Sequence, residues 1–239
     1  MSGRRPFPEG SGIFETLRTE NGQIAELTRH MRRAKKASAV TGISMPDEEV
    51  LRSEIDACLT LNPFSIGRLR ICISEACFVV THDPYEDIET LARLTFHSSS
   101  TQANGEQIKA YPYDWNYSVL DNARDYGFDD AILFNNANHV TETAISNIVM
   151  KIDNQWVTPP ISAGLLPGIM RGIAIDRCGV SVRNIHISEI ALVEEALLLS
   201  SLKIAQPVSH IGDFPMQLKP SVLELEAQIS AAVEYFSVR

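Results

Sequence analysis

Lys109 is the residue with the clearest capacity for covalent chemistry. It lies in a short Gln-Ile-Lys-Ala-Tyr run that follows a polar stretch between two apolar regions of the chain. Clefts between domains are favoured ligand sites, and a lysine that is partly removed from water there can act as a nucleophile or a base. The sequence therefore makes Lys109 the candidate catalytic residue.

Three other features could bind an anion. The segment Ser162–Arg171 places glycines and a proline directly before an expected helix, whose first backbone N–H groups have no intrahelical partner. Together with the helix dipole, these groups favour a phosphate. Ser200 and Ser201 add two hydroxyl groups at the end of an apolar strand, and Arg33 adds a guanidinium. Each feature also has an ordinary structural interpretation, as a connecting loop, a strand end or a solvated helix face.

Composition and missing motifs narrow the class of protein. The 239 residues are 44% hydrophobic and 21% charged, as in globular proteins, and no apolar run approaches the ~20 residues of a membrane span. The usual phosphate-loop, dinucleotide, serine-hydrolase and zinc-peptidase motifs are absent. A net charge of -9 disfavours nucleic acid and anionic lipid. We expect a cytoplasmic protein with a small-molecule substrate and no nucleic-acid or membrane partner.

The cysteines and the charge pattern add two expectations. The four cysteines form no Cys-x-x-Cys pair and none lies beside a histidine at metal-ligand spacing, so we expect reduced, mostly buried thiols and no metal. Residues 1–36 hold eight Lys/Arg and four Asp/Glu, a net of +4, so the remainder of the chain carries -13. The basic N-terminal part includes a cluster over residues 29–36.

The elements that must position these residues fall into two groups. The polar stretch 97–107 is interpreted as an interdomain linker, which gives a small N-terminal domain over residues 1–104 and a larger domain over residues 105–239. In the first domain we expect strands over 12–19 and 23–27 around an Asn-Gly turn, helices over 28–40 and 47–61, and strands over 68–74, 78–81 and 91–96.

Alternating helices and strands are expected after the linker. The pattern predicts helices over 116–126, 168–177, 188–195 and 220–236, and strands over 131–134, 146–152, 156–158, 180–185 and 196–200. The predicted fold class is therefore α/β, with a small α+β N-terminal domain and a larger mixed α/β C-terminal domain.

An ordered set of motifs resembles the fold-type-IV pyridoxal-phosphate enzymes, which include class IV aminotransferases and aminodeoxychorismate lyases. The similar segments run in the family's order from residue 12 to 213; they are Phe14–Arg18, His30–Arg33, Gly127–Ala131, Val140–Thr143, Ser146–Asn147, Thr158–Pro160, Gly164–Arg171 and Gln206–Val208. The resemblance implies a D-amino-acid aminotransferase-like fold, pyridoxal 5'-phosphate as cofactor in the larger domain, and a homodimer.

The resemblance also implies roles for individual residues. Lys109 would form the Schiff base with the cofactor and move the proton, and the carboxylate of Glu142 would pair with the pyridine nitrogen. The remaining implied contacts are, for the phosphate group, Arg33, Gly168, Ile169, Ser201 and Leu202; for the face of the cofactor, Tyr113; and, for the substrate, Thr16 and Arg70.

The region around Lys109 departs from the family pattern, so this segment can be aligned with the family in two ways, or frames. Without gaps, counting back from Asp129 places Lys109 at the family lysine. An alternative frame aligns Asn116-Tyr117 with an Asn-Tyr pair that follows the lysine in some aminotransferases, and then Pro112 occupies the lysine position. The second frame corresponds to a family member without catalytic activity, and we favour the first.

Two reactions are compatible with the first frame. The short chain and the Phe-Glu-Thr-Leu-Arg segment favour an aminodeoxychorismate lyase, which eliminates pyruvate and leaves 4-aminobenzoate. The alternative is a transaminase of the branched-chain or D-amino-acid type, which passes the amino group to a 2-oxo acid. Neither the carboxylate-binding arginine–histidine pair nor the tyrosine–arginine signature of those transaminases is found.

Overall fold

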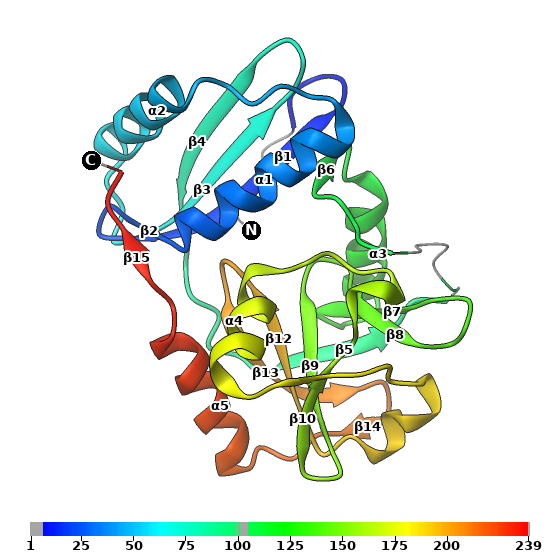
Figure 1. The fold of residues 1–239 in the computed structure, drawn as a ribbon. Coiled ribbons are helices and arrows are strands. Elements are labelled where there is room, and N and C mark those ends of the chain that lie inside the picture. The colour runs from blue at the N-terminus through cyan, green and yellow to red at the C-terminus, as the bar shows by residue number, and fades with distance from the viewer. Residues whose placement is uncertain (1–6, 99, 101–104, 239) are drawn as a thin grey trace. The chain divides into compact units, whose positions relative to one another are not determined.

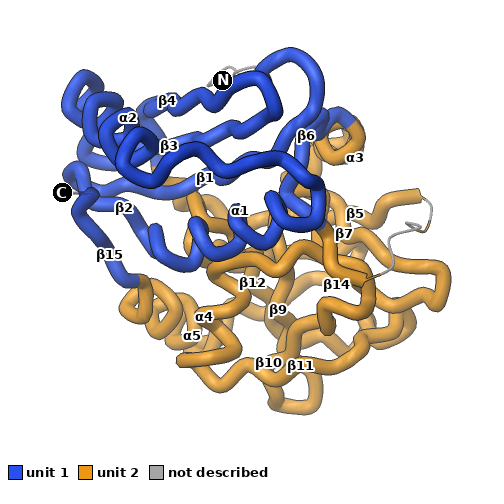
Figure 2. The backbone as a smooth tube through the Cα atoms, turned by 45° about the horizontal axis from the view of Figure 1, so that its top comes forward, with its two compact units in different colours: residues 1–86, 108–114, 234–239 blue, residues 87–107, 115–233 orange. Residues whose placement is uncertain are grey.

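The computed structural model describes residues 7–98, 100 and 105–238, and the chain divides into two compact units (Figure 2). Unit 1 comprises residues 1–86, 108–114 and 234–239, and unit 2 comprises residues 87–107 and 115–233. This division differs from the single boundary expected at 97–107, where residues 99 and 101–104 lie outside the described residues.

Backbone pairing explains the difference. Strand β5 (Ala92–Phe96) pairs in parallel with two strands of unit 2, although it precedes the expected linker. Strand β6 (Ala110–Tyr111) follows the linker but pairs with β1 of unit 1. Membership of a unit is therefore decided by hydrogen-bonded ladders between distant segments, which sequence order does not reveal.

Unit 1 is a six-stranded sheet with two helices on one face (Figure 1). The strand order is β15-β2-β1-β3-β4, with β6 beside β1. Its further elements are β1 (Gly12–Glu20), β2 (Gln23–Ala25), α1 (Leu27–Thr41), α2 (Glu48–Leu61), β3 (Ile66–Ile73), β4 (Phe78–Pro84) and β15 (Tyr235–Phe236).

Local sequence accounts for most of unit 1. Asn21 and Gly22 have φ values of 48° and 80° and form the two-residue turn between β1 and β2, as the Asn-Gly pair predicted. Gly42 ends α1 in the left-handed region, and the Asp47 carboxylate accepts N–H bonds at the start of α2. The helices predicted over 28–40 and 47–61 are thus confirmed to within one residue at each end.

The end of the chain differs from the prediction. Helix α5 (Pro220–Ala231) buries Val222, Leu225 and Ile229 but stops before residue 236. Tyr235 and Phe236 instead pair antiparallel with β2 as the edge strand β15. The prediction of a helix to Phe236 was wrong because the apolar spacing continues past the helix end, while edge pairing with β2 is a tertiary event.

Unit 2 is built on a nine-stranded sheet in the order β11-β10-β9-β12-β13-β5-β7-β8, with β14 beside β13. The strands are β7 (Asp130–Phe134), β8 (Val140–Thr143), β9 (Asn147–Ile152), β10 (Gln155–Thr158), β11 (Ser181–Val182), β12 (Glu195–Ser200), β13 (Ile204–Ile211) and β14 (Phe214–Pro215). Besides α5, the helices are α3 (Asp114–Asp125) and α4 (Ile169–Cys178), with 3₁₀ turns over Ile161–Ala163 and Ile187–Leu192.

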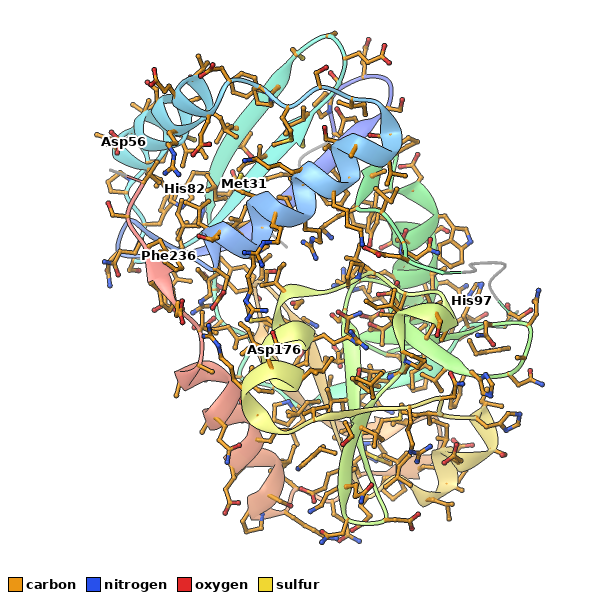
Figure 3. All side chains as sticks on the ribbon, in the orientation of Figure 1. Met31, Asp56, His82, His97, Asp176 and Phe236 are labelled. Carbon is orange, nitrogen blue, oxygen red and sulfur yellow. The ribbon has the colours of Figure 1, made fainter. Side chains whose placement is uncertain are left out.

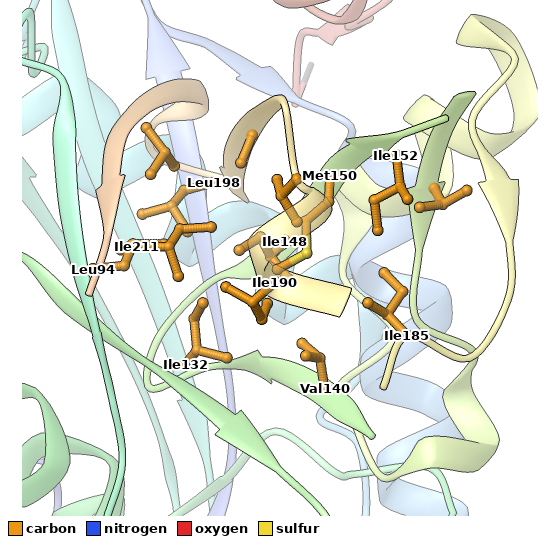
Figure 4. Packing of buried hydrophobic residues seen from close by; sticks show 14 of the residues in the cluster. Leu94, Ile132, Val140, Ile148, Met150, Ile152, Ile185, Ile190, Leu198 and Ile211 are labelled. Atoms are coloured by element: carbon orange, nitrogen blue, oxygen red, sulfur yellow. The ribbon is translucent and has the colours of Figure 1, made fainter. Parts of the chain in front are cut away.

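A continuous apolar core holds the strands of unit 2 together. Every residue of β9 is buried, as expected for a strand covered on both faces. Branched side chains from neighbouring strands interlock with it, and Figure 4 shows Leu94, Ile132, Ile148, Leu198 and Ile211 among them. The strand predicted over 180–185 is only the two-residue β11, and β8 was recognised as a motif but not as a strand.

Candidate active site

Lys109 lies in unit 1, beside the first strand. Its carbonyl oxygen accepts a hydrogen bond of 2.9 Å from the backbone N–H of Phe14, which fixes this stretch of backbone to β1. Its Nζ atom is 4.6 Å from the centroid of the Phe14 ring and 5.4 Å from that of Tyr113. Ring faces attract a cation, so the two aromatic side chains orient the lysine.

Arg70 and Thr16, the two predicted substrate residues, face one another across β3 and β1. Their Cα atoms are partners in the antiparallel register, so both side chains are on one face of the sheet. The Arg70 guanidinium lies 5.0 Å from the centroid of the Phe7 ring and 5.8 Å from that of Phe14. Its Nε atom is buried and has no hydrogen-bond partner among the residues that the structure describes.

Arg33 is held on the other face of β1 by Glu15. Alternate side chains of a strand point to opposite faces, so the Glu15 side chain is on the face of β1 away from Phe14 and Thr16. The guanidinium of Arg33 donates from Nε at 2.8 Å and from Nη2 at 2.5 Å to the two carboxylate oxygens of Glu15. This paired contact with both carboxylate oxygens orients the Arg33 guanidinium.

His30 completes a buried cluster with Glu15 and Arg33. Burial by itself raises the pKa of Glu15, but the positive charge of Arg33, followed by His30 and the hydrogen bonds from both, lowers that pKa to about 2. The ionised carboxylate can only accept, so Nδ1 of His30, 2.6 Å away, carries the proton. Burial lowers the pKa of His30, and the negative charge of Glu15 opposes that change.

Glu142 is held in unit 2 by a short network of hydrogen bonds. The side-chain amide of Asn147 donates from Nδ2 to Glu142 Oε2 at 3.0 Å and to the carbonyl oxygen of Leu166 at 3.0 Å. The backbone N–H of Leu166 donates to Glu142 Oε1 at 3.2 Å. One amide side chain thus fixes the carboxylate and the loop that leads into α4.

That loop ends in a helix terminus suited to an anion. Gly168 is the N-cap of α4, and no side chain caps the first turn. A Cβ atom on Gly168 would lie 1.8 Å from Asn147 Oδ1, so the close approach of Asn147 requires glycine here. The N–H groups without a side-chain cap, the helix dipole and the adjacent carboxylate fit a group that combines a phosphate with a protonatable ring, such as pyridoxal phosphate.

Ser201 and Leu202 form the tight turn between β12 and β13. The backbone N–H of Lys203 in the same turn donates to Ser200 Oγ at 3.3 Å. Burial lowers the pKa of Lys203, whereas the negative charge of Asp130 opposes the change. Lys203 is therefore a lysine with a lowered pKa that the sequence did not single out.

The structure groups the predicted residues unit by unit. In unit 1 it brings Lys109, Tyr113, Arg70 and Thr16 to one face of the sheet, with Arg33 on the opposite face of β1. In unit 2, hydrogen bonds link Glu142 to the loop that leads to Gly168 and Ile169. Ser201 and Leu202 lie together in the turn between β12 and β13 of the same unit.

Three residues that hold the others in place, Glu15, His30 and Asn147, were not predicted as site residues. Glu15 and Asn147 were quoted only as parts of motifs, and His30 only as the first residue of its helix segment. The strand alternation that buries Glu15 toward α1 was a usable signal, because a carboxylate among apolar residues of a buried strand needs a partner. The long-range contacts of Asn147 had no such signal.

The cysteines and the helix lengths can also be compared with the expectations from sequence. All four cysteines are free, but only Cys72 is buried; Cys58 and Cys178 are half-buried and Cys77 is exposed, so the expectation of mostly buried thiols was wrong. Within the described ranges, no helix is both long enough and apolar enough to cross a bilayer.

Comparison with known proteins places these features in a family. A family model described as Amino-transferase class IV matches residues 12–211. The chain is 26% identical to the aminodeoxychorismate lyase of Vibrio harveyi, over 90% of this chain and 90% of that protein. It is 24% identical to the D-alanine aminotransferase of Bacillus licheniformis, over 81% of this chain and 74% of that protein.

The fold has close counterparts among solved structures. A hypothetical aminotransferase from Mycobacterium tuberculosis, in its PLP-bound form, aligns with a TM-score of 0.83 at 18% identity, covering 97% of this chain and 94% of that one. This likeness confirms the aminotransferase-like fold that the motifs implied. Because the family model matches most of the sequence, this chain belongs to the class IV amino-transferase family.

Proposed function

We propose that the chain is a pyridoxal-phosphate-dependent aminodeoxychorismate lyase in which Lys109 carries the cofactor. The observation that carries the proposal is the network in which Asn147 holds both the Glu142 carboxylate and the loop before the uncapped terminus of α4. A structure that only needed a stable loop would not require an oriented carboxylate beside an anion site. The similarity to the Vibrio harveyi lyase, which extends over 90% of both chains, supports the choice of reaction.

Lys109 and Glu142 have complementary roles in this proposal. When bound, pyridoxal phosphate supplies an aromatic ring that takes up electrons from the substrate α-carbon. Nζ of Lys109 attaches the cofactor, then accepts the α-proton and returns a proton when the product leaves. Glu142 stays ionised and holds a proton on the pyridine nitrogen, which keeps the ring electron-poor.

Two kinds of group are proposed to hold the phosphate. Arg33, oriented by Glu15, supplies a guanidinium, and the backbone N–H groups at Gly168 and Ile169 supply a helix terminus. Ser201 and Leu202 add a hydroxyl and a backbone group from the turn after β12. All of them can remain fixed during the reaction.

The remaining predicted residues are proposed to contact the substrate side. Arg70, packed on the rings of Phe7 and Phe14, presents a guanidinium to a substrate carboxylate. Thr16 lies opposite Arg70 in the sheet and offers a hydroxyl. Tyr113, already in contact with Lys109, is proposed to face the cofactor ring.

Borohydride trapping tests cofactor binding. Protein purified with added pyridoxal phosphate should show a visible absorption band, and reduction should leave a covalent adduct on the peptide containing Lys109 in mass spectrometry. A protein that stays colourless with excess cofactor would contradict the proposal and favour the frame with Pro112 at the lysine position. That outcome supports a non-catalytic member of the family.

A product assay separates the two reactions. A lyase releases pyruvate and 4-aminobenzoate from aminodeoxychorismate without a keto-acid acceptor. A transaminase would instead require 2-oxoglutarate or another 2-oxo acid, and the similarity to the Bacillus licheniformis D-alanine aminotransferase makes it the alternative. Amino transfer without pyruvate release from aminodeoxychorismate would replace the lyase assignment.

Assembly and location complete the proposal. We propose a homodimer, which sedimentation velocity of the purified protein can test as a species of twice the 26.5 kDa chain mass. We also propose a cytoplasmic location, which fractionation of the source cells can test.

A further inference from the structure

Unit 1 contains a groove that the proposed reaction does not use. It lies between α1, α2 and residues 236–238, has a volume of about 560 Å³, and is lined by residues of unit 1. Ligand pockets in proteins commonly have volumes of roughly 300–1,000 Å³, so the groove has the size of a small-molecule site. Figure 3 labels Met31 on α1 and Phe236 on β15, two of the side chains that line it.

The floor of the groove is apolar and continuous with the core of unit 1. Its side chains belong to, or pack against, the cluster between the sheet and the two helices. Two flexible methionines in the floor let it adapt to an irregular apolar surface. The floor residues are Leu27, Met31, Met45, Leu51, Ile55 and Phe236.

The rim of the groove is positively charged in a protein with a net charge of -9. Arg32 and Lys35 project from α1 and Arg52 from α2, and Glu48 is the one acidic side chain among the described residues of the lining. Within the described part of the chain, Arg52 pairs with Glu48 at 2.9 Å, whereas Arg32 and Lys35 form no ion pair. Two exposed cations therefore remain beside an apolar floor, and this is the part of the basic N-terminal cluster that the proposed site leaves unused.

We propose that this groove binds a small amphipathic carboxylate, with its carboxylate at Arg32 and Lys35 and its unbranched apolar tail on the methionine-lined floor. The charge selects an anion, because a neutral or cationic ligand would leave two neighbouring cations uncompensated. The apolar floor selects a tail, because burying it removes apolar surface of both partners from water. The volume of the groove fits a small molecule, which favours this ligand over a helix or a membrane surface.

Methionine NMR provides a site-specific test with the full-length protein. With the methionine methyl groups labelled with ¹³C, decanoate below its micellar concentration should shift the Met31 and Met45 signals, both of which line the groove. Met150 and Met170 are buried in unit 2, and their signals should not move. Substitution of Met31 or Met45 by leucine assigns the two signals.

The charge and the alkyl length of the ligand give two further expected results. Decanoate should bind roughly 15-fold more tightly than octanoate, because each of its two additional buried methylenes contributes about fourfold in affinity. Decanol and decylamine should bind at least about tenfold more weakly than decanoate, because each lacks the charge-assisted contact. Equal affinity of all three ten-carbon probes would overturn the proposal.

Adjacent lysines on α1 supply the matched variants. Lys35→Gln should weaken decanoate binding about tenfold, whereas Lys36→Gln, which makes the same charge change outside the groove lining, should leave it within about twofold. Thr28→Trp, at an exposed residue of the lining, should fill the groove and abolish the methyl shifts without disturbing the core. Circular dichroism of each variant checks the fold.

Other outcomes assign the surface to another partner and overturn the proposal. If Arg32→Gln with Lys35→Gln dissociates a dimer in sedimentation velocity and decanoate shifts no methyl signal, the groove is an interface with a second copy. If anionic vesicles shift the signals while dissolved decanoate does not, the surface binds lipid bilayers.

Discussion

The surface around Lys109 and the network around Glu142 present two ways of holding a charged side chain. In unit 1, the Lys109 amine and the Arg70 guanidinium both lie over the ring of Phe14. Lys109 Nζ is 4.6 Å and Arg70 Cζ is 5.8 Å from the ring centroid. In unit 2, both oxygens of Glu142 accept hydrogen bonds from an amide side chain and a backbone N–H. Ring faces restrain a cation loosely, whereas hydrogen bonds define position and direction.

The difference matches the work that each group is proposed to do. A lysine that attaches a cofactor and moves a proton must change partners, and a contact with a ring face can be exchanged at small cost. A carboxylate that keeps one nitrogen protonated must not move during the reaction. Glu15 extends the second mode into unit 1, because its paired contact with Arg33 is also fixed by hydrogen bonds.

Removal of the Lys109 amine should have the largest effect. Lys109→Ala is expected to abolish the borohydride-stable adduct and to reduce activity by at least about 10⁴-fold, because attachment and proton transfer both disappear. The visible spectrum, peptide mass spectrometry and the pyruvate assay measure these changes. Lys203→Met is the matched control, since it removes the amine of another lysine, whose pKa is lowered by burial. An adduct that survives in Lys109→Ala and disappears in Lys203→Met would reverse the assignment.

Neutralising the fixed carboxylate should have the next largest effect. Glu142→Gln retains the size of the side chain but removes its charge, so activity should fall about 10²–10³-fold while the cofactor stays attached. Absorbance and the pyruvate assay separate cofactor retention from turnover. Glu194→Gln makes the same charge change at an ion pair with Lys219 and should leave activity unchanged. A loss of cofactor without a loss of turnover per bound cofactor would assign Glu142 to binding alone.

Glu15→Gln tests the contact between Glu15 and Arg33 through its effect on the free energy of unfolding. The pKa of Glu15 is about 2 in the folded protein against an ordinary value of 4.5, so its ionisation stabilises the fold by roughly 3 kcal/mol at pH 7. This stabilisation is complete above pH 4.5 and is lost as the pH falls toward 2. The variant should therefore be less stable by about this amount at pH 7, with a shrinking difference below pH 4.5.

Urea unfolding at pH 7, 5, 4 and 3 measures that difference. Glu48→Gln, which removes the exposed partner of Arg52, is the control and should change stability by less than about 1 kcal/mol at any pH. A difference for Glu15→Gln that stays constant between pH 5 and pH 3 would show that the ion pair is not responsible.

The smallest expected effect is that of a single methyl group at the start of α4. In Gly168→Ala the new Cβ would lie 1.8 Å from Asn147 Oδ1, so Asn147 must shift and its bond to Glu142 weakens. We expect a loss of about 1–2 kcal/mol in stability and about tenfold in activity. In an Asn147→Ala background the added cost of Gly168→Ala should vanish in a double-mutant cycle, and additive effects would exclude the clash as the cause.

Prediction from sequence succeeded where a signal is local. The Asn21-Gly22 turn and the left-handed Gly42 after α1 both depend on backbone conformations that few residues adopt. Each was therefore readable from two or three neighbouring residues. The family motifs between residues 12 and 211 belong to the same class, since their order along the chain is itself sequence information.

Prediction failed where an element is defined by a distant partner. Phe236 has the spacing of a helical face, but it pairs with Ile24 in the sheet of unit 1. Strand β5 precedes the polar stretch, yet it pairs with β7 and β13. Hydrophobic periodicity reports that a side chain is buried, and it contains no information about which segment buries it.

The sequence by itself determined the candidate amine Lys109, the glycine-led terminus of α4 and the excess of cations before residue 37. Only the tertiary structure decided that Glu15 orients Arg33, that Asn147 holds Glu142, and that cations of α1 border an apolar groove with the last strand. The physical reason is that residue type and local spacing set what a side chain can do. Long-range packing alone sets its neighbours, its charge state and the surface it shares.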